Sequence, residues 1–298
     1  MNYCRKPLVS VIITTYNRAN VLKNAIDSVL NQTYSNVEII VIDDGSEDDT
    51  NFLMKAYGDK IVSIFKSNTG KSHSRNIGLL ASNGSIIATL DSDDIWCPSY
   101  LAKTINHLLN NNLDIVFSAC LAHSFKYCKY NKGQYYVFDY KEIRESVLRQ
   151  CPAPTSGVIM QRTIIGDGWD VASMEYEDWH LQIECIIKNI NCRVGFVSEI
   201  LWEKREDDKV KNKLKTTQQN QRQTHDTNIL LIRLQQNLTE NEYSIVKQNY
   251  IKDTIRLLLV LIRNSESRKK IWQTAYMTLS EPTLLFRMIF NVLLNKIR

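Results

Sequence analysis

Residues 85–96 read SIIATLDSDDIW, an apolar, strand-like run that ends abruptly in the three carboxylates Asp91, Asp93 and Asp94. Like charges so close together repel each other unless something compensates them. A divalent cation would do so, because Mg²⁺ and Mn²⁺ prefer carboxylate oxygen and keep open positions for phosphate. A solvated acidic turn in which Asp94 caps the next helix would explain the same residues. Taken alone, the segment leaves both interpretations open.

Strands and helices alternate on both sides of this segment. Apolar runs predict buried strands, and apolar residues at helical spacing predict the helices between them. The predicted strands are 8–15, 37–42, 61–66, 85–90 and 114–119, and the predicted helices are 21–30, 47–57, 71–82 and 99–111. Ser46 is expected to cap the helix over 47–57. This order predicts an α/β fold with a parallel sheet and right-handed crossovers.

Polar clusters follow three of the predicted strands, at 15–18 (TYNR), 43–46 (DDGS) and 91–94 (DSDD). Ligands of such sheets bind beyond the carboxyl ends of the strands, so we expect these clusters to face one crevice. Lys71 and Arg75 should join the same rim. Carboxylates beside cations predict a pocket for a nucleotide diphosphate. The chain contains neither GxGxxG nor GxxxxGK[ST], which argues against a dinucleotide-binding fold and a P-loop.

Four segments carry a resemblance to a known family: PLVSVIITTYNR, VIDDGSEDDT, NTGKSHSRNIGLLASNG and IATLDSDDIW. In this order and spacing they resemble the successive signatures of family 2 glycosyltransferases with the GT-A fold. The resemblance implies a Rossmann-like, mostly parallel central sheet flanked by helices, followed here by a C-terminal helical extension. It also implies an inverting enzyme of the type that builds bacterial surface polysaccharides.

The resemblance implies a donor site as well. Its nucleotide-sugar-binding residues would be Thr15, Tyr16, Arg18, Asp44, Lys71, Arg75, Asp91 and Ser92. Asp44 would bind the nucleobase. Asp93 would hold a Mn²⁺ or Mg²⁺ ion that bridges the donor's diphosphate, and Asp94 would start the next helix. Plainer interpretations remain for some of them, since Asp-Asp-Gly-Ser commonly shapes a turn and Arg75 could be a surface charge.

A second acidic pair, Glu177-Asp178, precedes Trp179 and a run of isoleucines at helical spacing, so it falls in the first turn of a predicted helix. Carboxylates there are stabilised by the helix dipole, which makes capping one explanation. The resemblance implies another, with Asp178 as the general base, Glu177 as its catalytic neighbour and Trp179 on the acceptor side. A base that takes the acceptor's proton during direct displacement would invert the anomeric centre. The preceding segment 152–160 also resembles the acceptor-side loop and strand of the family.

One departure from the family pattern concerns the metal. Many members carry a histidine about 25 residues after the base, whereas this chain reads LWEKREDDK at 201–209. Glu206 or Asp207 falls near the missing ligand, and His225 lies too far along the chain to be assigned. Metal coordination beyond Asp93 is therefore open.

The pattern divides the chain into three parts. Residues 1–205 would form the catalytic domain, with a nucleotide-binding half at 7–119 and an acceptor half at 120–205. Residues 206–225 read as a polar linker or lid, and 226–298 as a basic helical region. The last segment, 282–298, is apolar with basic residues, and such a helix either lies on an anionic membrane surface or packs on protein.

Composition limits the remaining choices. The chain has 298 residues, 44% hydrophobic and 23% charged, which suits one α/β domain with an appendage. Its seven scattered cysteines contain no CxxC pair and fit reduced thiols. The N-terminus does not read as a secretory signal, and no apolar run approaches the roughly 20 residues that span a bilayer. We therefore expect a cytoplasmic protein with at most peripheral membrane contact.

The expected activity is metal-dependent transfer of a sugar from a nucleotide-sugar donor, UDP-hexose or UDP-N-acetylhexosamine, to a glycan. The acceptor would be an O-antigen or capsule intermediate on a lipid diphosphate. A net charge of +5 without a stacking or binding module argues against nucleic acid. Two alternatives remain: a nucleotidyltransferase, which leaves Glu177-Asp178-Trp179 unexplained, and a nucleotide-sugar-binding but inactive homologue. The sequence does not specify an oligomeric state.

Overall fold

A computed structural model describes residues 6–120, 135–204, 217–263 and 274 of the chain. The chain divides into two compact units. The first comprises 1–171 and 177–211, and the second comprises 172–176 and 212–298.

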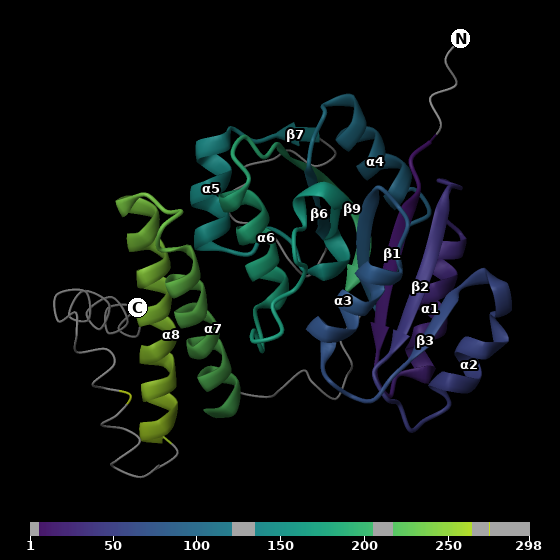
Figure 1. Ribbon diagram of the computed structural model, residues 1–298, viewed down its shortest axis with the longest axis horizontal. Coiled ribbons are helices and arrows are strands. Elements are labelled where there is room, and N and C mark those ends of the chain that lie inside the picture. The colour runs from purple at the N-terminus through teal and green to yellow at the C-terminus, as the bar shows by residue number, and fades with distance from the viewer. Residues whose placement is uncertain (1–5, 121–134, 205–216, 264–273, 275–298) are drawn as a thin grey trace. The chain divides into compact units, whose positions relative to one another are not determined.

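The first unit is built on one mixed sheet (Figure 1). Its strands are β1 (Val9–Thr15), β2 (Val37–Asp43), β3 (Val62–Phe65), β4 (Ile86–Asp91), β5 (Asp94–Trp96), β6 (Ile115–Cys120), β7 (Tyr135–Val137), β8 (Val158–Gln161) and β9 (Val194–Lys204). Along the sheet the order is β3-β2-β1-β4-β8-β6-β9-β5, and β7 pairs with β9. The strands β3, β2, β1 and β4 are parallel, as are β6 and β9. The strand β8 runs antiparallel to both β4 and β6.

The helices of this unit connect the strands. They are α1 (Ala19–Leu30), α2 (Thr50–Ala56), α3 (Lys71–Ala81), α4 (Tyr100–Asn110), α5 (Tyr140–Arg149) and α6 (Glu177–Lys188), with short 3-10 helices at Gly58–Lys60, Thr155–Gly157 and Arg162–Ile164. The central strands are apolar on both faces and buried almost throughout, as expected for a sheet covered on both sides. The predicted α/β fold class is therefore confirmed.

Two local predictions in the first unit are wrong. The helix predicted from residue 47 begins at Thr50, because Asp43 accepts hydrogen bonds from the amide and hydroxyl of Ser46 and keeps that residue in a turn. Asp94 does not start a helix. It begins β5, where it is 2% exposed and accepts a hydrogen bond of 2.6 Å from the hydroxyl of Ser156.

The second unit contains α7 (Thr217–Leu234) and α8 (Glu240–Arg263), which pack together through buried apolar side chains such as Leu230, Leu234 and Val246. Thr239 and Glu242 cap α8 through reciprocal hydrogen bonds. Residues 217–225, expected to belong to a polar linker, lie in α7. The rest of that linker falls outside the described residues, as do Glu206, Asp207 and the segment 282–298.

Two further expectations concern the whole chain. Among the helices of residues 6–120, 135–204 and 217–263, none is long and apolar enough to cross a membrane. The thiols are free at every cysteine in the described ranges, namely Cys97, Cys120, Cys151, Cys185 and Cys192.

Candidate active site

A cavity of about 460 Å³ opens in the first unit beyond the carboxyl ends of β1, β2 and β4. It is lined by Thr14, Thr15, Tyr16, Arg18, Asp44, Lys71, Ser74, Arg75, Asp91, Ser92, Asp93, Asp94, Asp178 and Lys204. The three polar clusters predicted to share one crevice therefore do so. Of the residues predicted for the site, only Glu177 and Trp179 are absent from its lining.

One end of the cavity is formed by Asp44 and the loop that leads into α3. Asp44 is ion-paired with Lys66 and accepts hydrogen bonds of 2.9 Å from the amides of Thr69 and Gly70. Burial alone would raise the pKa of Asp44. The hydrogen bonds from Lys66, Thr69 and Gly70 and the charge of Lys66 outweigh that effect, so the pKa lies below its usual value. Gly45 permits the close approach: its φ is +83°, and a Cβ there would lie 2.8 Å from the amide nitrogen of Asn68.

The carboxylates of Asp91 and Asp93 both reach the cavity, and each faces a guanidinium. Asp93 is ion-paired with Arg18, and Asp91 lies 3.0 Å from Arg75. The backbone of Asp91 is held by Ser156, whose hydroxyl accepts its amide proton at 3.0 Å.

These residues fit a divalent cation in chemical type. The oxygens of Asp91 and Asp93 are the hard donors that Mg²⁺ and Mn²⁺ prefer, and both carboxylates are partly exposed toward the cavity. Within the described parts of the chain, no three His, Cys, Asp or Glu side chains gather as metal ligands.

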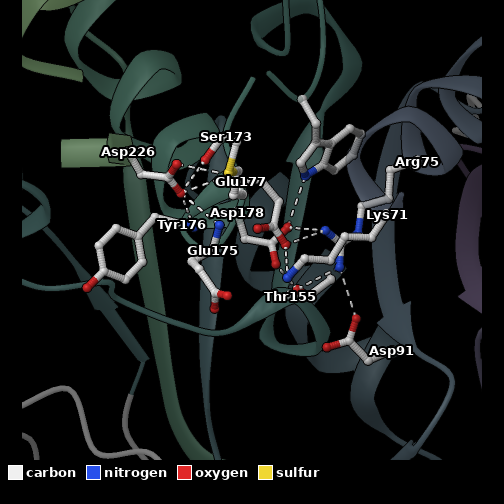
Figure 2. A network of polar contacts seen from close by, with 12 residues as sticks. Lys71, Arg75, Asp91, Thr155, Ser173, Glu175, Tyr176, Glu177, Asp178 and Asp226 are labelled. Carbon is white, nitrogen blue, oxygen red and sulfur yellow. Dashed lines mark hydrogen bonds and ion pairs between the residues drawn. The ribbon is translucent and has the colours of Figure 1, made fainter. Parts of the chain in front are cut away.

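Arg75 lies at the centre of a buried polar network (Figure 2). The side chain is 3% exposed, and its guanidinium lies 3.0 Å from Glu177, 2.9 Å from Asp178 and 3.2 Å from the hydroxyl of Thr155. Together with its contact to Asp91, the guanidinium joins three carboxylates. Burial lowers the pKa of Arg75, but these carboxylates raise it more, so the group stays charged.

The two acidic residues at the start of α6 behave differently. Glu177 is 1% exposed and lies 2.5 Å from the ammonium of Lys71, and Lys71 and Arg75 lower its pKa despite burial. Asp178 reaches the cavity, and burial together with the charges of Glu177 and Asp91 raises its pKa. Glu177 is thus suited to be a permanent counter-ion and Asp178 to accept a proton.

Asp178 has further partners. Its Oδ1 atom accepts a hydrogen bond of 3.0 Å from the indole of Trp169, and its Oδ2 atom accepts the hydroxyl proton of Thr155. The neighbouring Trp179 points elsewhere: its indole donates to the carbonyl of Val147 at 2.6 Å. The acceptor-side role of Trp179 remains a prediction.

Sequence reasoning missed Lys66, Ser156, Thr155 and Trp169. Thr155 and Ser156 lie in the segment 152–160 that was singled out, but nothing in its pattern distinguishes a residue that contacts the base from one that shapes the loop. Lys66 pairs with Asp44, 22 positions earlier, and Trp169 contacts Asp178, 9 positions later, and neither spacing follows a helix or strand period that the sequence could have shown.

The fold is shared with solved glycosyltransferase structures. A crystal structure of TarS from S. aureus in complex with UDP-GlcNAc has a TM-score of 0.61 and 15% sequence identity, covering 85% of this chain and 81% of that one. A mannosyltransferase from Pyrobaculum calidifontis in complex with GDP-Man and Mn²⁺ has a TM-score of 0.61 and 14% identity, covering 95% and 81%. The expected GT-A fold is confirmed.

The family follows from sequence comparison. The model of the family described as glycosyl transferase family 2 matches residues 10–177. The chain is also 30% identical over 198 residues to the UDP-Glc:alpha-D-GlcNAc-diphosphoundecaprenol beta-1,3-glucosyltransferase WfgD of Escherichia coli, covering 64% of this chain and 75% of WfgD. This chain belongs to glycosyl transferase family 2. Three uncharacterized glycosyltransferases of Rickettsia are 43–45% identical over 108–115 residues, and the matched part is a third or less of their own length.

Proposed function

We propose that this protein is an inverting glycosyltransferase that moves a sugar from a nucleotide-sugar donor to a glycan. One observation carries the proposal: Asp178, a carboxylate that is only 20% exposed and has a raised pKa, lines the same cavity as Asp44 and the Asp91-Ser92-Asp93 segment. Asp44 and the Asp91-Ser92-Asp93 segment suit a nucleotide and its diphosphate. Asp178 suits the base that an acceptor hydroxyl needs.

The donor is a UDP-sugar, with glucose and N-acetylglucosamine as the first candidates. The name of WfgD specifies UDP-Glc, and one TarS structure holds UDP-GlcNAc. The acceptor is a glycan on a lipid diphosphate, by analogy with the GlcNAc-diphosphoundecaprenol in the name of WfgD. Such an acceptor is presented at a membrane surface, which supports peripheral association of this protein with the cytoplasmic membrane.

The donor lies along the cavity from Asp44 to Asp91. In this arrangement Asp44 binds the nucleobase, and Thr15, Tyr16 and Arg18 lie beside the base and ribose. Asp93, with Asp91 beside it, would hold a divalent cation, Mn²⁺ or Mg²⁺, and the bound ion would supply positive charge for the leaving diphosphate. The Mn²⁺ in the mannosyltransferase structure supports this choice of metal.

The protein's own groups manage the proton. Asp178 accepts the proton of the acceptor hydroxyl as that oxygen attacks the anomeric carbon, and the bond to the diphosphate breaks on the opposite face. Lys71 and Arg75 keep Glu177 ionised, so the neighbouring negative charge maintains the basicity of Asp178. One displacement with one base inverts the anomeric configuration.

The test is a transfer assay with a matched inactive variant. Purified full-length protein is incubated with UDP-glucose or UDP-GlcNAc, a synthetic GlcNAc-diphosphate lipid and Mn²⁺ or Mg²⁺, and the product is analysed by mass spectrometry. We expect transfer by the wild type and a loss of at least about 1000-fold for Asp178→Asn, with UDP binding retained. UDP binding without transfer by the wild type would favour an inactive homologue. Pyrophosphate-dependent nucleotide exchange would favour a nucleotidyltransferase.

A further inference from the structure

Asp178 accepts a hydrogen bond from a residue, Trp169, that is not part of the site predicted from the sequence. Trp169 is 3% exposed and precedes α6, and its indole nitrogen lies 3.0 Å from Oδ1 of Asp178. Trp169 is not among the residues that line the cavity. Any effect of Trp169 on the reaction would therefore act through its hydrogen bond to Asp178, the proposed general base.

Counting donors distinguishes the two oxygens of Asp178. A carboxylate offers about two lone-pair positions on each oxygen. Oδ1 accepts the hydrogen bond of Trp169 at 3.0 Å, and the guanidinium of Arg75 lies against the same oxygen at 2.9 Å as an ion pair. On Oδ2 the hydroxyl of Thr155 occupies one. The second position on Oδ2 remains for a proton that arrives from the cavity.

The indole is a suitable second donor for Oδ1. A further cation there would stabilise the charged carboxylate strongly and reduce its basicity, as Arg75 already does in part. The neutral N–H of Trp169 fixes the plane of the carboxylate at a smaller cost in basicity. Trp169 thus orients the carboxylate while lowering its proton affinity less than a second cation would.

Trp169 is itself held by α3. The side chain of Asn76 accepts the amide proton of Trp169 at 2.8 Å and donates to its carbonyl at 2.7 Å. Gly168 has a φ of +87°, and a Cβ at this position would collide with the side-chain oxygen of Asn76. Two consecutive residues of α3 therefore act on the same carboxylate: Arg75 directly, and Asn76 through Trp169.

We propose that Trp169, clamped by Asn76, is a positioning residue that holds Oδ1 of Asp178 by a hydrogen bond and leaves Oδ2 as the proton-accepting atom. The inference rests on the proposed function, because it presupposes that Asp178 is the base. It assigns to Trp169 no contact with donor or acceptor.

The experiment replaces Trp169 by Phe in the full-length chain, which keeps the ring and removes the N–H. Transfer from the UDP-sugar that the wild type uses to the synthetic GlcNAc-diphosphate lipid gives kcat, and calorimetry with UDP gives a dissociation constant. We expect kcat to fall about tenfold, the loss of one neutral hydrogen bond, while the affinity for UDP changes less than about twofold. The acid limb of kcat should move to higher pH, because the charged form of Asp178 loses a donor while Arg75, Lys71, Glu177 and Asp91 around it are unchanged.

Tyr34→Phe is the matched control. The hydroxyl of Tyr34 donates to the carbonyl of Pro7 at 2.6 Å, and the residue is 6% exposed, so the variant also keeps the ring and loses one buried neutral hydrogen bond. It should lose similar thermal stability and keep both kcat and the acid limb. A merely structural role for Trp169 predicts that the two variants behave alike, and that result would overturn the proposal.

Asn76→Ala provides the second arm. If Asn76 acts through Trp169, the double variant should be no slower than Trp169→Phe alone, whereas independent effects would multiply. Multiplying effects, or a Trp169→Phe enzyme with wild-type kcat and pH profile, would refute the positioning role while Asp178→Asn still abolishes transfer. If the wild type and Asp178→Asn are indistinguishable, the proposed function itself fails.

Discussion

Replacing Arg75 by Met removes the cation that joins three carboxylates in the core of the first unit. The guanidinium is 3% exposed and contacts Asp91, Glu177, Asp178 and the hydroxyl of Thr155. Removing one partner of a buried ion pair costs about 3–5 kcal/mol, because the remaining charge has lost its compensation. Lys71 still faces Glu177, which keeps the expected loss in free energy of unfolding within this range rather than above it.

Urea unfolding followed by tryptophan fluorescence measures the effect. With a slope of about 3 kcal/mol per molar, a loss of 3–5 kcal/mol lowers the midpoint by roughly 1–2 M. Arg75→Lys should recover only part of this loss, since an ammonium is a point charge and cannot reproduce the four contacts of the fork. Lys103→Met is the control: its partner Glu199 lies 2.5 Å away but both side chains are over a third exposed, so the loss should stay below about 1 kcal/mol.

The dependence on pH gives the stricter check. The folded-state pKa of Glu177 is lowered, so its contribution to stability is present above its usual value of 4.5 and is lost as the pH falls through the folded value. Without Arg75 that lowering is smaller, and the difference between wild type and Arg75→Met should shrink as the pH drops below 4.5. A loss of less than about 1 kcal/mol at pH 7, or a difference that grows in acid, would refute the reasoning.

Three further outcomes are expected. The acid limb of kcat should have its midpoint above 3.8, the usual pKa of an aspartate, because the pKa of Asp178 is raised; pH–rate measurement checks this, and a lower midpoint contradicts it. Lys66→Met should weaken UDP binding about tenfold by removing the cation paired with Asp44, while Tm falls; calorimetry showing unchanged affinity would refute it. Asp226→Asn should destabilise the second unit by about 2–4 kcal/mol, because this fully buried carboxylate accepts hydrogen bonds of 2.7–3.0 Å from the amides of Met174, Glu175 and Tyr176. Hydrogen exchange at residues 174–176 measures the effect, and rates equal to those of the wild type would contradict it.

The donor half of the site could be predicted because its signals are local. Each of β1, β2 and β4 is a short apolar run followed at once by its polar cluster, and parallel strands bring their carboxyl ends to one edge. The predicted positions from Thr15 to Asp93 therefore needed no knowledge of distant contacts. Asp178 was found from the family resemblance; the structure places it in the lining of the cavity, and its role as base stays a prediction.

The two wrong predictions, for Asp94 and Ser46, concern sequence patterns that are compatible with more than one local backbone structure. Asp94 has the sequence context of a helix cap, but β5 pairs with β9, and Asp94 lies opposite Lys204 in the ladder. That pairing joins residues more than a hundred positions apart, which no local pattern reports. Likewise, Ser46 is a good cap in isolation, but it donates to the carboxylate of Asp43 and accepts the amide proton of Asn17, and these contacts keep it in the turn.

The same distance in sequence explains why the two predicted halves of the catalytic domain cannot be independent. The strand β8, from the acceptor half, pairs with β4 on one side and β6 on the other, both formed mainly by the nucleotide half. Above that junction Arg75 joins Asp91, from the donor side, to Asp178, on the acceptor side. Each half would therefore leave strand edges or charges without compensation if it folded alone. The positions of Asp91 and Asp178 in the cavity therefore depend on each other, and a substitution at the guanidinium they share should disturb both.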